Sequence, residues 1–171
     1  MSILPLFLLL DRPTSTQRAH FSLFHPYTSS NSSPSSLGTV IHVVGAPMLG
    51  FALEFKRSYS PAENGLQNNM TFIGKINTEN LHIWTGEQGI DDVPRGKVED
   101  LAAGIRPPGV SANFFAPLND TTNRRCQEWT IEFVRKLVEV GYLDSEAVEL
   151  VQSKRDPPSF GIGLRPVPGG Q

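Results

Sequence analysis

The chain has 171 residues, enough for one domain with its own hydrophobic core. Its 15 basic and 17 acidic residues give a formal net charge of -2, so bulk charge does not favour binding to nucleic acid or to anionic lipid. A single cysteine excludes an internal disulfide. A free thiol survives most simply in the cytosol, so we expect a cytoplasmic protein.

The first element is an apolar run from Ile3 to Leu10, which ends at Asp11. It is about as long as the core of a signal peptide, but no basic residue precedes it and Pro5 interrupts it, so a secretory signal is disfavoured. It is also too short to cross a bilayer as a helix. Short apolar runs bounded by turn residues are typical of central strands, and we predict a fully buried strand.

Four further strands are predicted in the first half, from β-branched residues and from alternation of apolar and polar residues. They cover residues 18–25, 39–44, 51–59 and 70–77. A Ser-rich segment, 27–38, is predicted to join the first two as a flexible hairpin loop. Residues 78–95 contain several Gly and Pro residues and are predicted to form an extended loop.

The second half is predicted to be helical. A short helix is expected over residues 96–105. From Asn123 to Val140 apolar residues recur at steps of three and four, and Gly141 stands where a left-handed residue ends a helix. A shorter helix follows over residues 144–153.

Strands that precede helices favour an α+β fold over a wound parallel sheet. We therefore predict an antiparallel sheet from the N-terminal half, packed against C-terminal helices. The domain is expected to cover residues 1–152, and the Pro- and Gly-rich residues 153–171 to form a tail.

Cys126 lies in the first turn of the long predicted helix, after polar residues 119–122 that could cap it. The helix dipole and the neighbouring Arg124 and Arg125 should favour the thiolate, which is the reactive form of the thiol. Cys126 also falls on the apolar stripe of the helix, so it could equally be an inert buried residue.

Two histidines are candidate partners of this thiol. If the Ser-rich segment is the tip of a hairpin, His20 falls opposite His42 and both share one face of the sheet. We expect the cysteine-bearing helix to cover that face, which would give the thiol a base and an orienting group. His25 and His82 are interpreted as structural residues.

A zinc site is an alternative, because Cys126, His20 and His42 could supply one sulfur and two nitrogen ligands. Zinc sites usually show close ligand pairs such as C-x-x-C, and none occurs in this sequence. We therefore predict no metal and no cofactor.

Three short blocks stand in an order that resembles a known type of enzyme. They are "HFSLF", which begins at His20, "GTVIHVVGAP", which contains His42, and "RRCQEWTIEFV", which contains Cys126. This order resembles that of the permuted papain-like thiol enzymes of the lecithin:retinol acyltransferase type. The resemblance implies that His20 is the general base, that His42 orients it and that Cys126 forms a thioester with an acyl group. The chain is also similar to small fungal proteins that share the second block and "NRRCQEW". No reaction is known for these proteins, so this likeness implies none.

The resemblance implies thiol-dependent hydrolysis or acyl transfer on a small ester, amide or peptide-like substrate. Gln127, Trp129 and Ser22 are expected to contact that substrate. The family's cysteine block reads N-C-E-H-F, and Glu128 stands in place of its histidine, so a lipid substrate follows less directly than thiol chemistry. The alternative is a non-catalytic domain on the same fold, which binds a ligand or a protein and in which Cys126 is structural.

Overall fold

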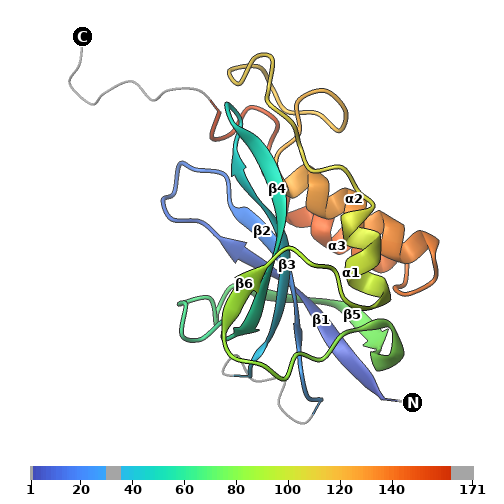
Figure 1. Ribbon diagram of the computed structural model, residues 1–171. Helices are drawn as coiled ribbons and strands as arrows, with labels where there is room; N and C mark the ends of the chain where they lie inside the picture. The colour runs from blue at the N-terminus through green and yellow to red at the C-terminus, as the bar shows by residue number, and fades with distance from the viewer. Residues whose placement is uncertain (1, 30–35, 163–171) are drawn as a thin grey trace.

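Six antiparallel strands form one sheet, and three helices lie on one of its faces, in the computed structural model of residues 2–29 and 36–162 (Figure 1). The strands are β1 (Ile3–Asp11), β2 (His20–Pro26), β3 (Gly38–Ala46), β4 (Gly50–Tyr59), β5 (Met70–Asn77) and β6 (Gly89–Asp91). The helices are α1 (Gly96–Ala103), α2 (Cys126–Glu139) and α3 (Glu146–Lys154). The predicted α+β class, with its antiparallel sheet and C-terminal helices, is confirmed.

The strand order across the sheet is β5-β1-β2-β3-β4-β6. The pairing of β2 with β3 runs from Leu23, opposite Ile41, toward the loop. The predicted register, with His20 opposite His42, is therefore wrong by two residues, because β2 continues as far as Pro26 before the chain turns. A shift of two residues leaves every side chain on its original face, so both histidines still share one face.

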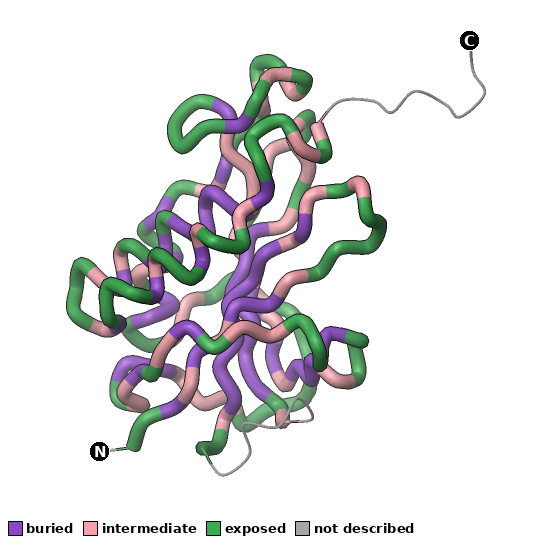
Figure 2. The backbone as a smooth tube through the Cα atoms, turned by 180° about the vertical axis from the view of Figure 1, so that it is seen from behind, coloured by how far each residue is buried: buried purple, intermediate pink, exposed green. Residues whose placement is uncertain are grey.

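The two faces of the sheet have different partners. On the face that the helices cover, Phe21 and Phe55 pack in the main core with Trp129 of α2. Phe24 and Val40 belong to a smaller core on the opposite face. Figure 2 shows the buried positions running through the middle of the strands. Because side chains alternate along a strand, these neighbours determine the face of each strand residue.

Strand β1 agrees with the first predicted strand, but the face away from the helices is buried only in part, at Leu9. Leu4, Leu6 and Leu8 are buried under the helices. Ile3 is 52% exposed on the other face. The helices form a layer on one face alone, so an apolar run does not by itself show burial on both faces.

Residues 78–95 were predicted to form a loop, yet they contain a 3-10 helix, Thr78–Asn80, and strand β6. Arg57 of β4 explains the position of β6. Its guanidinium donates to Asp91 of β6 and to Glu99 of α1. An ion pair between distant segments leaves no local pattern, so the short strand could not be predicted from its own residues.

The domain extends beyond the predicted boundary at residue 152. Helix α3 ends at Lys154, and Asp156 is 9% exposed, where its carboxylate accepts a hydrogen bond from the Ala19 backbone N–H. The first residues of the predicted tail therefore belong to the domain, because they cover the start of β2. Residues 163–171 lie outside the described part of the chain.

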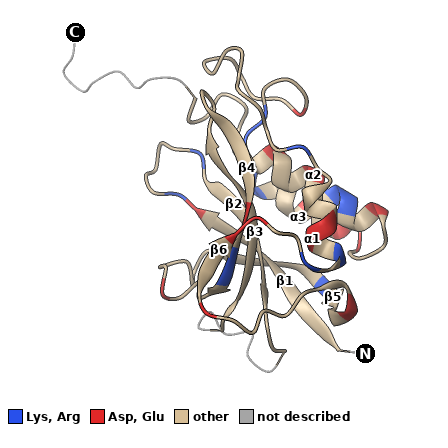
Figure 3. Ribbon diagram, in the orientation of Figure 1, with Lys and Arg blue, Asp and Glu red and all other residues tan. Residues whose placement is uncertain are grey.

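Charged residues of both signs are intermixed over the helical layer (Figure 3). Among the described residues, no helix is long and apolar enough to cross a bilayer.

Candidate functional site

Cys126 is the first residue of α2, three residues after the predicted start of the helix. Arg125 is the N-cap residue, and its backbone N–H donates to the Glu128 carboxylate at 3.0 Å. A residue within the helix therefore caps it, in place of the polar residues 119–122. Asn119 holds the preceding turn, because its Oδ1 accepts hydrogen bonds from the backbone N–H groups of residues 121–123.

Asn119→Ala should lower the free energy of unfolding by about 1–2 kcal/mol, because these backbone N–H groups lose their acceptor. Urea denaturation measures the change. Asp120→Ala is the matched control, since its carboxylate is 53% exposed and pairs with Arg155 at the surface, and it should change stability by about 0.5 kcal/mol or less. Equal losses in both variants would contradict the role of Asn119.

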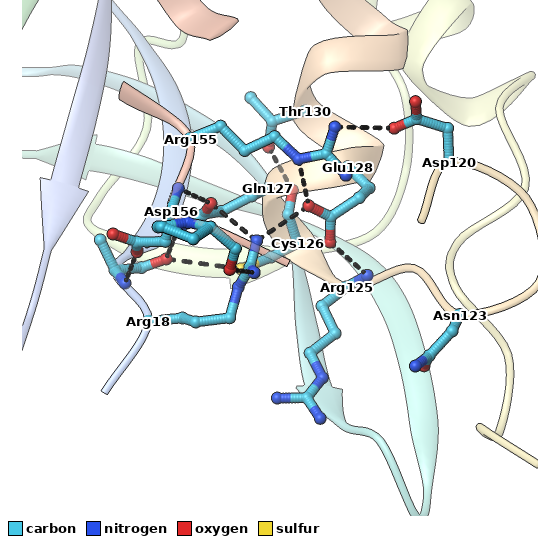
Figure 4. A network of polar contacts seen from close by, with 12 residues as sticks. Arg18, Asp120, Asn123, Arg125, Cys126, Gln127, Glu128, Thr130, Arg155 and Asp156 are labelled. Carbon is cyan, nitrogen blue, oxygen red and sulfur yellow. Dashed lines mark hydrogen bonds and ion pairs between the residues drawn. The ribbon is translucent and has the colours of Figure 1, made fainter. Parts of the chain in front are cut away.

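A buried polar network ties the first turn of α2 to the start of β2 and to the segment after α3 (Figure 4). The Glu128 carboxylate accepts from Arg18 at 2.9 Å and from Arg155 at 3.0 Å. Asp156 accepts from the Gln127 side-chain amide at 2.8 Å. Because these groups satisfy one another inside the protein, the network holds the helix terminus in place.

The three predicted substrate contacts are buried. Trp129 lies in the main core, and its Nε1–H donates to the Ile105 carbonyl at 3.3 Å. Gln127 is fully buried, and its amide also donates to the Ala19 carbonyl at 2.9 Å. Ser22 is 5% exposed. Burial leaves these side chains no surface for a substrate, so their contribution is to packing and to the polar network.

The Cys126 thiol lies beside strand β2, with its Sγ 4.0 Å from the Ala19 carbonyl oxygen. Burial raises the pKa of this thiol above its ordinary value, although the backbone N–H groups of Phe21 and Gln127 favour the thiolate. The expected lowering of the pKa by the helix dipole and by nearby arginines is therefore wrong for this site. Desolvation, together with the charge of Glu128, outweighs the hydrogen bonds and the charge of Arg18 and keeps the resting thiol neutral.

His20 and His42 form a hydrogen-bonded chain with Glu54. His20 Nε2 lies 2.8 Å from His42 Nδ1, and His42 Nε2 lies 2.7 Å from Glu54 Oε2. Burial lowers the pKa of His20 to about 4 and that of His42 to about 3, so both rings are neutral at pH 7. Sequence reasoning missed Glu54, although alternation along its strand and a hairpin over residues 45–50 would bring it opposite His42.

The thiol and the His20 imidazole lie on opposite faces of β2. Phe21 packs under the helices, so its neighbour His20 points to the other face, in register with Asp11 of β1. The expectation that α2 covers the two histidines is therefore wrong. The helices cover the more apolar face of β2, which carries Phe21 and Leu23. The opposite face carries His20 and Ser22.

A cavity of about 330 Å³ at this end of the sheet is lined by both His20 and Cys126. Asp11, Gly45 and Phe51 extend the wall across the ends of neighbouring strands. Since the pairing of β2 with β3 begins at residue 23, the two strands are unpaired where the cavity lies. The cavity therefore draws its wall from both faces of the sheet. A separate cavity of about 410 Å³ lies over β1 and β5 and has no contact with these groups.

The described residues contain no group of three His, Cys, Asp or Glu side chains that could hold a metal ion. The zinc alternative therefore has no ligand set in this part of the chain, because the sulfur and the two imidazoles are on different faces of the sheet.

A family model described as "Family of unknown function (DUF6540)" matches residues 6–144. The match includes Cys126, His20, His42 and Glu54. No curated protein matches the chain, and no solved structure matches it.

Proposed function

We propose that this chain, which belongs to the DUF6540 family, catalyses thiol-dependent hydrolysis or transfer of an acyl group on a permuted papain-like fold. The observation that carries the proposal is the hydrogen-bonded chain from Glu54 through His42 to His20, which ends at a cavity that Cys126 also lines. A nucleophile, a base and groups that orient the base are the parts that such chemistry requires. The order of two histidine strands and a later cysteine helix supports the fold assignment.

The hydrogen bonds determine which ring nitrogen can act as the base. A carboxylate only accepts, so His42 Nε2–H donates to Glu54, and His42 Nδ1 is left as an acceptor. His20 Nε2–H then donates to that nitrogen. The lone pair of His20 therefore lies on Nδ1, which is the atom that would take the thiol proton.

The reaction proceeds in two halves. His20 Nδ1 takes the proton of the Cys126 thiol while the sulfur forms a bond to the acyl carbon, and backbone N–H groups at the start of α2 stabilise the oxyanion. The bond between the acyl carbon and the leaving group then breaks, and the imidazolium gives its proton to the leaving group. A thioester between Cys126 and the acyl group remains. Water or an acceptor then gives a proton to His20 and forms a bond to the acyl carbon. The C–S bond breaks, and the sulfur takes the proton from His20, which restores the thiol.

This mechanism requires the His20 ring and the thiol to approach each other when a substrate fills the cavity. His20 is the first residue of β2 and lies beyond the pairing with β3, although it still pairs with Asp11 of β1. The approach therefore requires this end of β2 to shift. Catalytic contacts are often long before substrate binds and shorten in the complex.

A second candidate function is non-catalytic binding of a ligand or a protein by the same domain. The raised pKa of the Cys126 thiol and its separation from the imidazoles by β2 favour this alternative. In that case Cys126 packs against the core and the polar network is structural.

Mass spectrometry of the intact protein after incubation with p-nitrophenyl acetate and with an acyl anilide separates the two functions. We expect a single acyl adduct on Cys126, absent in Cys126→Ala. Glu54→Gln should slow acylation by about tenfold or more, because the base loses its orienting chain.

Glu63→Gln is the matched control, because it removes an exposed carboxylate outside the site and should leave the acylation rate unchanged. A folded protein whose Cys126 forms no adduct with either donor would support the binding function instead.

A further inference from the structure

The cavity beside Cys126 carries two arginines. Arg18 and Arg125 both line it. Among the described lining residues, Asp11 alone carries a carboxylate. The start of α2 adds the positive end of a helix dipole at the same place. The described lining therefore carries two guanidinium groups and one carboxylate, although the Glu128 carboxylate also acts on the thiol.

The guanidinium of Arg125 is incompletely satisfied. Its Nη2 donates to the Phe114 carbonyl at 3.1 Å, and its Nε is buried with no acceptor among the described residues. Arg125 forms no ion pair with any described residue. The nearby Glu128 carboxylate pairs with Arg18 and Arg155 instead. Figure 4 shows the Arg125 side chain turned away from the polar network.

Arg18 is more fully satisfied than Arg125 and keeps one free donor. Its Nη1 donates to the Pro157 carbonyl, and its Nη2 donates to Gln127 and Glu128. Its side chain is 6% exposed and pairs with Glu128, but the same carboxylate also pairs with Arg155. Its Nε is buried and has no acceptor in the described residues.

Burial, and then the charge of Arg18, lower the pKa of Arg125. Two like charges thus lie close together. The carboxylates of Glu128 and Asp156 act on Arg18, and the described residues show no ion pair to Arg125.

We propose that Arg18 and Arg125 form a subsite for a carboxylate group on the acyl substrate of Cys126. Guanidinium groups bind carboxylates through charge-assisted N–H donors, and buried donors without an acceptor are rare in folded proteins. Both arginines line the same cavity as Cys126, so a carboxylate bound there lies in the cavity that the sulfur faces. That the bound group is a substrate rests on the proposed function. The presence of the subsite does not.

Two alkylating reagents that differ by one carboxylate test the subsite. The Cys126 sulfur forms a bond to the CH₂ carbon of iodoacetate or iodoacetamide, the C–I bond breaks, and iodide leaves with the bonding electrons. The ratio of the two rates is measured at pH 8.5 and low salt, relative to the ratio for N-acetylcysteine. We expect this relative ratio to be raised about tenfold in favour of iodoacetate, which corresponds to one charge-assisted hydrogen bond.

Arg125→Gln should return the ratio to the value of the small thiol. Arg135→Gln, which removes an exposed charge from the same helix, should leave it raised. A wild-type ratio equal to that of N-acetylcysteine, or a raised ratio that Arg125→Gln leaves unchanged, would overturn the proposal. Inorganic phosphate that protects Cys126 from iodoacetamide better than acetate does would overturn the assignment of a carboxylate.

Failure of the subsite and failure of the proposed function are distinguishable. A preference for iodoacetate without acylation by any donor establishes the subsite and contradicts thiol catalysis. Acylation of Cys126 without that preference supports thiol catalysis and overturns the subsite.

Discussion

Lowering the pH from 7 to 4 should reduce the free energy of unfolding by several kcal/mol. Burial lowers the pKa of His20 and of His25 to about 4 and that of His42 to about 3. In the unfolded chain each imidazole has its ordinary pKa of about 6.5. Below that pH the unfolded state binds protons that the folded state does not bind, so stability falls as the pH falls.

The expected loss begins near pH 6.5 and is complete below the folded pKa values. One pKa unit corresponds to about 1.4 kcal/mol, so the shifts of His20 and His25 correspond to about 3–4 kcal/mol each and that of His42 to about 5 kcal/mol. Together they are comparable with the whole stability of a small domain, and we expect unfolding between about pH 4 and pH 5. Urea denaturation at half-unit steps of pH measures the slope.

His25→Leu should reduce that slope by about one proton between pH 4 and pH 6.5. His25 is suited to this test because it is 1% exposed and its Nε2 has no partner among the described residues. Val151→Ala is the control, since it lowers stability at a buried site without changing a titrating group. A stability that stays constant from pH 7 to pH 5 would show that the imidazoles are solvated or charged in the folded protein.

Glu128→Ala should lower the free energy of unfolding by about 3–5 kcal/mol, the cost of removing one member of a buried ion pair. Glu128 is 3% exposed and accepts from Arg18, from Arg155 and from the Arg125 backbone N–H. Its loss leaves the guanidinium of Arg18 buried without a carboxylate and removes the cap of α2. Urea denaturation at pH 7 measures this effect.

Glu132→Ala is the matched control on the same helix. Its side chain is 50% exposed and pairs with Arg124 at the surface, so the expected change is about 0.5 kcal/mol or less. Glu128→Gln should fall between the two, because it keeps hydrogen-bonding capacity and loses the charge. Similar losses in Glu128→Ala and Glu132→Ala would mean that the network adds little to stability.

The main elements could be predicted because their signals are local. Alternation along residues 51–59 and the three- and four-residue steps before Gly141 need no knowledge of distant residues. Gly141 has a φ of 84°, which confirms the expected left-handed end of α2. Strand β6 was missed because its position depends on Arg57, a residue of another strand.

The candidate site could be predicted in part for the same reason. A period of two along a strand determines that His20 and His42 share a face, and this holds even though the register differs by two residues. Neither residue shows which face the helix covers. That choice depends on the summed apolar area of each face, and the face with Phe21 and Leu23 is the one under α2.

The sequence by itself determined the α+β class, most of the strands and helices, and the shared face of the two histidines. Only the tertiary structure decided the position of Cys126 relative to those histidines and the state of its thiol. The physical reason is that burial and charge act through space. The raised pKa of Cys126 and the two incompletely paired arginines arise from segments more than a hundred residues apart in the chain.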